Sequence, residues 1–246
     1  MLLVFWRGAR LLIHVLWGLL LCVLICRFPY SKRIPIVQYW SKHLLRILRL
    51  SYHLNGVPVP LPEQKVLLTA NHISWVDVFV ILAVRPVRFI AKAEVRRWPI
   101  LGWMATVSGT LYIERESRRE VLLFSETMQH AFILGHSLGL FPEGTTSMGT
   151  ALLPFHQSLF EPAIAQSIPI CPVILQYRDD SGEMSTSIPF VGEMTLWDSL
   201  KKILQAPPSQ VLIRIGPLVE THGKNRKVVA RQIEEISQTL LGGQFT

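Results

Sequence analysis

The segment Asn71-His-Ile-Ser-Trp-Val-Asp77 contains a histidine and an aspartate at a spacing that suits acid–base chemistry. A carboxylate that accepts a hydrogen bond from an imidazole fixes its tautomer and stabilises the imidazolium, and a general base of this kind contributes roughly 10²–10⁴ in rate. The pattern His-x-x-x-x-Asp also arises by chance, and a lone histidine more often has a structural role. We predict His72 and Asp77 as a catalytic pair, and other segments must support that prediction.

The segment Phe141-Pro-Glu-Gly-Thr-Thr-Ser147 combines proline, glycine and hydroxyl residues at the end of a predicted strand. These residue types form tight turns, and such a turn can present the Glu143 carboxylate and the amides of Gly144 and Thr145 to a polar ligand. A plain strand-to-loop turn has the same composition. Taken alone, this segment leaves both interpretations open.

Two further segments carry weaker signals. Gly109-Thr-Leu-Tyr-Ile-Glu-Arg-Glu-Ser117 predicts a strand that ends at Arg115, whose guanidinium can bind a phosphate in bidentate fashion or simply lie at the surface. Ile168-Pro-Ile-Cys-Pro-Val173 predicts a buried strand flanked by proline. No second histidine or cysteine lies near His72 at the spacing of a zinc site, so we expect no metal.

The elements around these segments indicate an α/β fold. A strand over residues 65–70 ends just before His72, where α/β folds place reactive groups, and a helix over 74–84 follows with Ser74 as its expected N-cap. Further strands are predicted at 87–91, 110–113, 137–141, 170–176 and 211–215, and further helices at 98–106, 118–134 and 224–241. This alternation predicts a mixed, largely parallel sheet flanked by helices.

The N-terminal part has the character of a membrane anchor. Residues 11–26 are almost wholly apolar with basic residues on both sides, and no small-x-small cleavage site follows, so we expect a retained anchor. Residues 37–54 mix apolar and basic side chains as an amphipathic helix does. Three prolines between 57 and 62 indicate a linker. We therefore predict membrane-associating helices over residues 1–54 and an α/β domain over residues 55–246.

Composition supports a membrane association. Half of the residues are apolar, 17% are charged, the mean hydropathy is +0.34 and the formal charge is +8. The positive charge suits an anionic phospholipid surface, a coenzyme or an acidic carrier protein, and no nucleic-acid-binding motif accompanies it. A basic set is either a solvated face or a patch for headgroups and coenzyme phosphates: Arg85, Arg88, Lys92, Arg96 and Arg97. The three cysteines suggest no disulfide framework and favour a reducing compartment.

The four motif segments, in this order and spacing, resemble the glycerolipid acyltransferase family that includes 1-acylglycerol-3-phosphate (lysophosphatidate) acyltransferases, over residues 55–217. The resemblance implies transfer of an acyl group from acyl-CoA or acyl carrier protein to a lysolipid hydroxyl, with His72 as base and Asp77 supporting it. It also implies that Arg115, Glu143, Gly144 and Thr145 bind the acceptor. A thioester is already activated, so no cofactor, metal or covalent nucleophile is needed.

The resemblance first implies 1-acylglycerol-3-phosphate as the acceptor, giving phosphatidate. Two departures remove positive charge from the expected phosphate site: Thr146 replaces a usual arginine, and Phe155-His-Gln-Ser158 replaces a lysine-containing Phe-Lys-x-Gly stretch. Another lysolipid, such as a lyso-ornithine lipid, is therefore the alternative. We expect the protein at the inner membrane of a bacterium, with its catalytic domain facing the cytoplasm.

Two other functions compete. Gly135-His-Ser-Leu-Gly139 matches the nucleophile elbow of serine esterases, with Ser137 as nucleophile. An elbow serine precedes a helix at once, whereas Pro142 and Gly144 follow here, and residues 121–134 suit a helix better than the strand that an elbow requires. A non-catalytic lipid-binding protein would also explain the basic anchor, although it would not explain the joint presence of His72, Asp77, Arg115 and Glu143.

Overall fold

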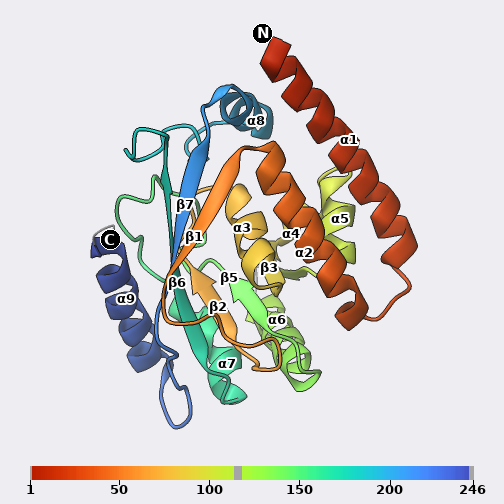
Figure 1. Cartoon of the computed structure of the whole chain (residues 1–246). Helices are drawn as coiled ribbons and strands as arrows, with labels where there is room; N and C mark the ends of the chain where they lie inside the picture. The colour runs from red at the N-terminus through yellow and green to blue at the C-terminus, as the bar shows by residue number, and fades with distance from the viewer. Residues whose placement is uncertain (1, 114–117, 244–246) are drawn as a thin grey trace.

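The structure is a computed structural model that describes residues 2–113 and 118–243 of the 246-residue chain. At its centre lies one sheet with the strand order β1-β7-β6-β2-β5-β3-β4 (Figure 1). The strands are β1 (Leu50–Gly56), β2 (Leu67–Ala70), β3 (Arg88–Lys92), β4 (Leu111–Ile113), β5 (Leu138–Leu140), β6 (Ile170–Arg178) and β7 (Ser209–Ile215). Only β6 and β7 pair in antiparallel fashion within this sheet. The predicted mixed, largely parallel sheet is confirmed.

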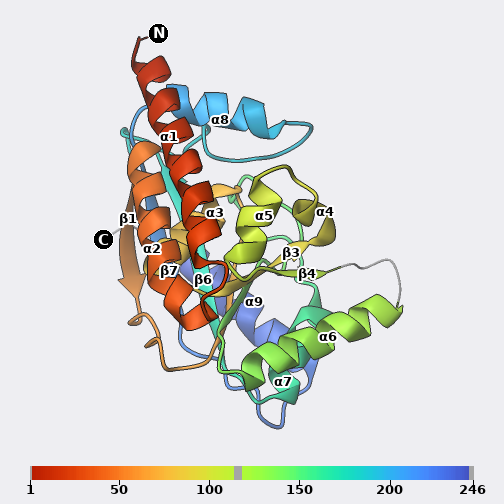
Figure 2. The same ribbon diagram turned by 90° about the vertical axis from the view of Figure 1, so that its right-hand side faces the viewer.

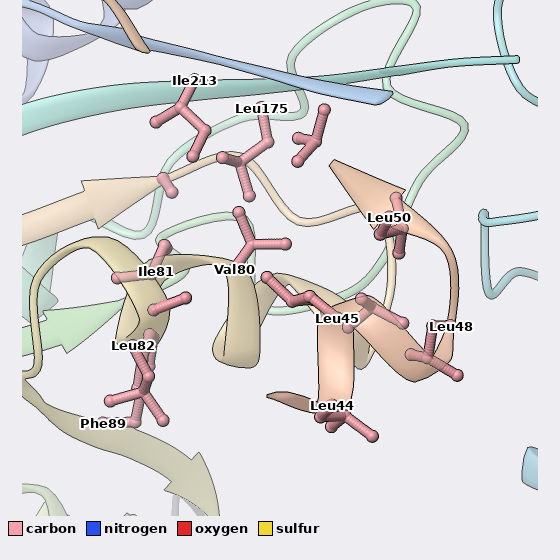
Figure 3. Packing of buried hydrophobic residues seen from close by; sticks show 14 of the residues in the cluster. Leu44, Leu45, Leu48, Leu50, Val80, Ile81, Leu82, Phe89, Leu175 and Ile213 are labelled. Carbon is pink, nitrogen blue, oxygen red and sulfur yellow. The ribbon is translucent and has the colours of Figure 1, made fainter. Parts of the chain in front are cut away.

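Helices cover both faces of the sheet (Figures 1 and 2). They are α1 (Leu2–Ile25), α2 (Tyr30–Ile47), α3 (Val76–Val84), α4 (Ala93–Arg96), α5 (Leu101–Val107), α6 (Arg118–Ile133), η1 (Gln157–Phe160), α7 (Glu161–Ala165), α8 (Leu196–Gln205) and α9 (Arg226–Gly242). One apolar cluster joins the sheet to α1, α2, α3 and α5, and a second joins it to α6, α7 and α9. Leu45 of α2 and Val80 of α3 pack beneath Leu175 of β6 in the first cluster (Figure 3).

The structure corrects the predicted end of the second helix. That helix ends at Ile47, Arg49 adopts a left-handed φ of 59°, and β1 begins at Leu50 and pairs with β7. The expected boundary between residues 54 and 55 thus falls inside a strand of the sheet. The local apolar spacing suits a helix through Leu54, but the strand partner lies far along the chain, so tertiary pairing overrides the local pattern.

The sequence analysis also missed α8, although its start carries a standard signal. Thr195 and Asp198 form a capping box, in which the Asp198 amide donates to the Thr195 hydroxyl at 3.1 Å and the Asp198 carboxylate accepts from the Thr195 amide at 3.3 Å.

The helix α1 is long and apolar enough to cross a membrane, yet one of its sides is packed against the domain. Its buried side includes Arg7, Leu11, His14, Cys22 and Ile25. Its other side exposes Phe5, Leu12, Ile13, Leu16, Leu20, Val23 and Leu24. The residue spacing places the exposed set on a single stripe.

Arg7 fastens the N-terminal end of α1 to the domain. Its guanidinium is buried and donates to the carbonyls of Leu48, Ile203, Leu204 and Ala206, which lie at the C-terminal ends of α2 and α8. A cation is favoured there because helix C-termini carry partial negative charge and unpaired carbonyls. The helix α1 is therefore packed into the domain and is no separate appendage.

Candidate active site

The loop that follows β2 carries the predicted catalytic pair. Asn71 fixes the start of this loop, since its side chain donates to the Leu175 carbonyl at 3.0 Å and accepts from the Leu175 amide at 2.8 Å. One turn later, Asp77 lies in the first turn of α3. The His72 Nδ1 and an Asp77 carboxylate oxygen, Oδ2, are 2.8 Å apart. The five-residue spacing thus brings the two side chains together as predicted.

The Asp77 carboxylate is fully buried and held from three directions. Its Oδ2 accepts from His72 and also from the amides of Ile73 and Ser74, at 2.7 and 2.8 Å, and its Oδ1 accepts from the Tyr177 hydroxyl at 2.6 Å. The prediction of Ser74 as N-cap is wrong: the cap position is Trp75, and the Ser74 hydroxyl has no partner among the described residues. The Ile73 and Ser74 amides that bind Asp77 precede the helix, so this carboxylate holds the His72 loop against the start of α3.

The His72 ring is held on a flat aromatic surface. It stacks on Phe141, with the ring centroids 3.9 Å apart and the planes 6° from parallel, and Phe141 in turn stacks on Phe89 of β3. The Ser147 amide also donates to the His72 carbonyl at 2.8 Å. The side chain stays 20% exposed. Because Nδ1 faces a carboxylate, the network assigns the ring hydrogen to Nδ1 and leaves the lone pair of Nε2 available.

The structure brings the segment 141–147 against His72 but treats its polar groups unequally. Thr145 is exposed, and among the described residues no acceptor binds its amide. The Gly144 amide is used within the turn, donating to the Phe141 carbonyl at 3.1 Å, and Gly144 has a φ of 70°. Of the two predicted amide donors, the one at Gly144 has a partner, and the one at Thr145 has none among the described residues.

Glu143 lies inside the protein. The residue is 4% exposed, and neither carboxylate oxygen has a hydrogen-bond partner among the described residues. Burial raises the pKa of Glu143 to about 7, and the neighbouring backbone N–H groups of His72 and Leu153 offset only part of that increase. The Glu143 carboxylate therefore lies in the interior, next to the His72 backbone. Its predicted role in acceptor binding stays a prediction.

Arg115 falls outside the described residues, so its predicted contact with the acceptor stays a prediction. The preceding strand β4 borders a cleft of about 590 Å³ that is shared with α4 and α6. Its lining includes Arg96, Arg97, Tyr112, Leu123 and Phe124, and the Arg96 guanidinium lies 5.9 Å from the centre of the Tyr112 ring. His72 is not part of this lining.

The two segments that depart from the family pattern have internal partners. The Thr146 hydroxyl donates to the Phe190 carbonyl, and the Phe155 amide donates to Glu234 at 3.2 Å. The Phe190 amide donates to the Ile73 carbonyl at 2.9 Å, so Phe190 links the turn at Thr146 to the His72 loop. A neutral hydroxyl that is already bonded to a carbonyl occupies the position of the expected arginine.

Ser137 lies at the other end of the strands. In the parallel pair of β2 and β5, Leu67 is opposite Leu138. Ser137 therefore lies just before the amino end of β5, whereas His72 lies just after the carboxyl end of β2, at the opposite edge of the sheet. Its hydroxyl accepts from the Val66 amide at 3.2 Å and from Arg85 at 3.0 Å. Turns and loop follow β5, with no helix before residue 157. The geometry of a nucleophile elbow is absent here.

The sequence analysis missed three residues that shape the site. Tyr177 and Leu175 come from β6, and Phe141 was noted only as the start of a turn. No local signal marks Tyr177, because its contact with Asp77 spans 100 residues. The alternation of side chains along a strand explains it afterwards: Leu175 and Tyr177 are two residues apart on one face of β6, and both belong to the apolar cluster that includes α3.

Comparisons with known proteins identify a family and several relatives. The family described as Acyltransferase matches residues 53–176. The lyso-ornithine lipid O-acyltransferase of Pseudomonas aeruginosa is 33% identical over 244 residues, covering 96% of this chain and 93% of that protein. The 1-acyl-sn-glycerol-3-phosphate acyltransferase of Neisseria meningitidis is 40% identical over 180 residues, covering 71% of this chain and 70% of that protein.

The fold has a solved counterpart. The crystal structure of PlsC, a 1-acyl-sn-glycerophosphate acyltransferase from Thermotoga maritima, superposes with a TM-score of 0.70 at 17% identity, covering 97% of this chain and 94% of that one. The family match over half of the chain and the nearly full-length relative agree with one another. The chain therefore belongs to the Acyltransferase family, as an O-acyltransferase of the 1-acylglycerol-3-phosphate acyltransferase type.

Proposed function

We propose that the chain moves an acyl group from a thioester to the free hydroxyl of a lysolipid, with His72 as general base. The observation that carries this proposal is the 2.8 Å contact between His72 and the buried Asp77, which leaves Nε2 unengaged. The lysolipid hydroxyl gives its proton to Nε2 while its oxygen attacks the thioester carbonyl. The tetrahedral intermediate then expels the thiolate, which takes that proton from His72.

We propose that the Thr145 amide stabilises negative charge at this centre. It has no protein acceptor among the described residues, its residue is exposed, and it belongs to the turn whose Ser147 amide holds the His72 loop. Preorganised amides of this kind are worth about 3–4 kcal/mol where oxyanion charge develops. Arg115 and Glu143 keep their proposed role in acceptor binding.

For the acceptor, we favour a lyso-ornithine lipid over 1-acylglycerol-3-phosphate. The Thr146 hydroxyl, bonded to the Phe190 carbonyl, leaves no cation where the resemblance expects one for a phosphate. An ornithine headgroup carries its own amine beside a carboxylate and needs less positive charge from the protein. The Pseudomonas relative with this name also matches nearly the full chain, while the Neisseria relative supports 1-acylglycerol-3-phosphate as the second candidate.

A competition assay tests both acceptors. Purified protein receives a labelled acyl thioester with equal amounts of the two lysolipids, and products are separated by mass spectrometry. We expect the lyso-ornithine product to dominate, and Thr146→Arg to shift the ratio toward phosphatidate. Exclusive phosphatidate formation by the unaltered protein would reverse the order of candidates. Transfer to neither lysolipid, with thioester hydrolysis alone, would contradict acyl transfer to these acceptors.

We propose that the donor is acyl-CoA or acyl carrier protein and that the cleft at Arg96 and Arg97 receives its phosphorylated end. The cleft lies at the carboxyl edge of β3 and β4, and β2 is three strands from β4, about 14 Å at 4.8 Å per strand. An extended pantetheine arm suits that separation. Arg96→Ala/Arg97→Ala should raise KM for the donor and leave KM for the acceptor unchanged, with Lys201→Ala/Lys202→Ala on α8 as the matched control.

We propose that the protein binds a lipid surface through the exposed stripe of α1, at the inner membrane of a bacterium with the site facing the cytoplasm. The stripe and the flanking basic residues support membrane binding. Leu16→Glu/Leu20→Glu should reduce co-sedimentation with anionic vesicles, whereas Val228→Glu on α9, also at an exposed apolar position, should not. Equal sedimentation of both variants would contradict this placement.

A further inference from the structure

Tyr177 makes a contact with the catalytic pair that the proposed mechanism does not yet use. It lies in β6, is 1% exposed, and donates its hydroxyl hydrogen to Asp77 Oδ1 at 2.6 Å. The other carboxylate oxygen receives the remaining three donors, His72 Nδ1 and the amides of Ile73 and Ser74. Tyr177 is therefore the sole partner of Oδ1 among the described residues.

We propose that Tyr177 is a positioning residue that orients the Asp77 carboxylate and lowers the proton affinity of His72. This inference rests on the proposed role of His72 as base. A donor on Oδ1 fixes the plane of the carboxylate, so that Oδ2 stays in line with Nδ1. It also withdraws negative charge from Asp77, so that the imidazolium is less strongly stabilised and releases its proton to the leaving thiolate more easily.

The surroundings of Tyr177 and Asp77 keep the phenol protonated, so that it remains a hydrogen-bond donor. Burial, together with the charge of Asp77, raises the pKa of Tyr177 well above its usual value, so the phenol remains a donor. Glu143 also lies close enough to Asp77 for the two charges to interact, and Phe141 covers the His72 ring with an apolar surface. Asp77, Tyr177 and Glu143 are therefore the titratable groups that the described residues place beside His72.

Position in the fold distinguishes this role from simple packing. The Asn71 side chain ties the His72 loop to Leu175, two residues before Tyr177 on the same strand. β6 thus holds both the start of the loop and the far oxygen of the carboxylate. A tyrosine that only filled space would need no hydrogen bond to a catalytic acid, and phenylalanine would replace it with a loss of stability alone.

The test is Tyr177→Phe, which keeps the ring and removes the hydroxyl, with Tyr52→Phe on β1 as the matched control. Histidine-labelled protein in detergent gives one titration curve per histidine, and His72→Gln identifies the His72 signal. We expect Tyr177→Phe to raise the midpoint of the His72 titration by roughly half to one pH unit, and the acid limb of kcat/KM to move with it. Both KM values should stay unchanged, and Tyr52→Phe should leave both profiles in place.

Two further outcomes are decisive. Asp77→Asn should move the His72 midpoint downward, opposite to Tyr177→Phe, because it removes the charge that Tyr177 tempers. Titration and activity profiles of Tyr177→Phe that superimpose on those of the unaltered protein would overturn the inference. A shifted titration in a protein whose His72→Ala variant keeps full activity would support the coupling of Tyr177 to His72 and overturn the proposed function instead. Combining Tyr177→Phe with Glu143→Gln should preserve the shift, which excludes Glu143 as its source.

Discussion

The two ends of the central parallel strands carry polar clusters that look alike in sequence and differ in structure. At the carboxyl ends, His72 meets Asp77 and Tyr177, and at the amino ends, Ser137 meets Arg85. Arg85 is buried and also donates to the carbonyls of Pro60, Leu61 and Gln64. Both clusters join a nucleophile or base motif to a buried charge.

The difference lies in what each cluster leaves unsatisfied. In the cluster at Ser137, the Arg85 guanidinium donates to carbonyl oxygens and so holds the loop at residues 60–64 against the sheet. The cluster at His72 leaves Nε2 without a partner in the described part of the chain, on a side chain that is 20% exposed. A polar group that is partly exposed and held rigidly from behind can serve chemistry, whereas one bonded on all sides serves stability.

Among changes that test this difference between the two clusters, removal of the His72 side chain should have the largest effect on activity. His72→Ala should lower kcat by roughly 10²–10⁴, because it removes the proton acceptor, while the three other donors keep Asp77 in place. Transfer of a labelled acyl group measures the effect, and His53→Ala on β1 is the control. Activity within a few-fold of the unaltered protein would contradict the base role.

At the opposite end, Arg85→Met should act on stability alone. Removing one partner of a buried, multiply bonded charge costs about 3 kcal/mol, because several carbonyls lose their donor. We expect a lower Tm in thermal unfolding and an unchanged kcat for the protein that remains folded. A fall in kcat at unchanged Tm would place Arg85 in the chemistry and remove the contrast between the two ends.

Glu143 predicts a pH dependence of stability with an unusual sign. Its pKa is about 7 in the folded chain and 4.5 ordinarily, so between these values the folded state keeps a proton that the unfolded chain has lost. Stability contributed by this group is present below about pH 4.5, falls as pH rises through 7, and then stays constant. The fall is about 3 kcal/mol at most.

Glu143→Gln tests that sign because glutamine does not titrate. Unfolding curves at pH 5 and pH 8 give the free energy of unfolding of both proteins. Relative to the unaltered protein, the variant should be more stable at pH 8 than at pH 5. A gap between the two proteins that is independent of pH would mean that Glu143 stays ionised, with partners that the buried site does not display.

The smallest effect should come from Ser137→Ala. It removes one acceptor for the Val66 amide and one for Arg85, worth about 1 kcal/mol together, and leaves acyl transfer unchanged. The same assay and unfolding curves measure both quantities. Abolished turnover would instead support the esterase interpretation, with the chemistry at Ser137 and not at His72.

Much of the fold follows from local patterns. The strands around 67–70, 88–92 and 170–178 and the helices α3, α6 and α9 appear within a few residues of their predicted positions, because their apolar periodicity agrees with the local propensity. The failures have a common cause. β1 exists because β7 offers it a partner, and Tyr177 was not predicted because its contact with Asp77 spans 100 residues. Neither relation can be seen within a short window of sequence.

For the site, the sequence by itself determined the proposed base, its carboxylate and the turn beside them, because a five-residue spacing after a strand restricts where two side chains can meet. Only the tertiary structure decided which groups of the site are exposed and which are buried. It buried Glu143, left Thr145 open, and placed Tyr177 against Asp77 across 100 residues of chain. Strand order and sheet face set those relations, and both arise from pairings between distant segments that no local pattern encodes.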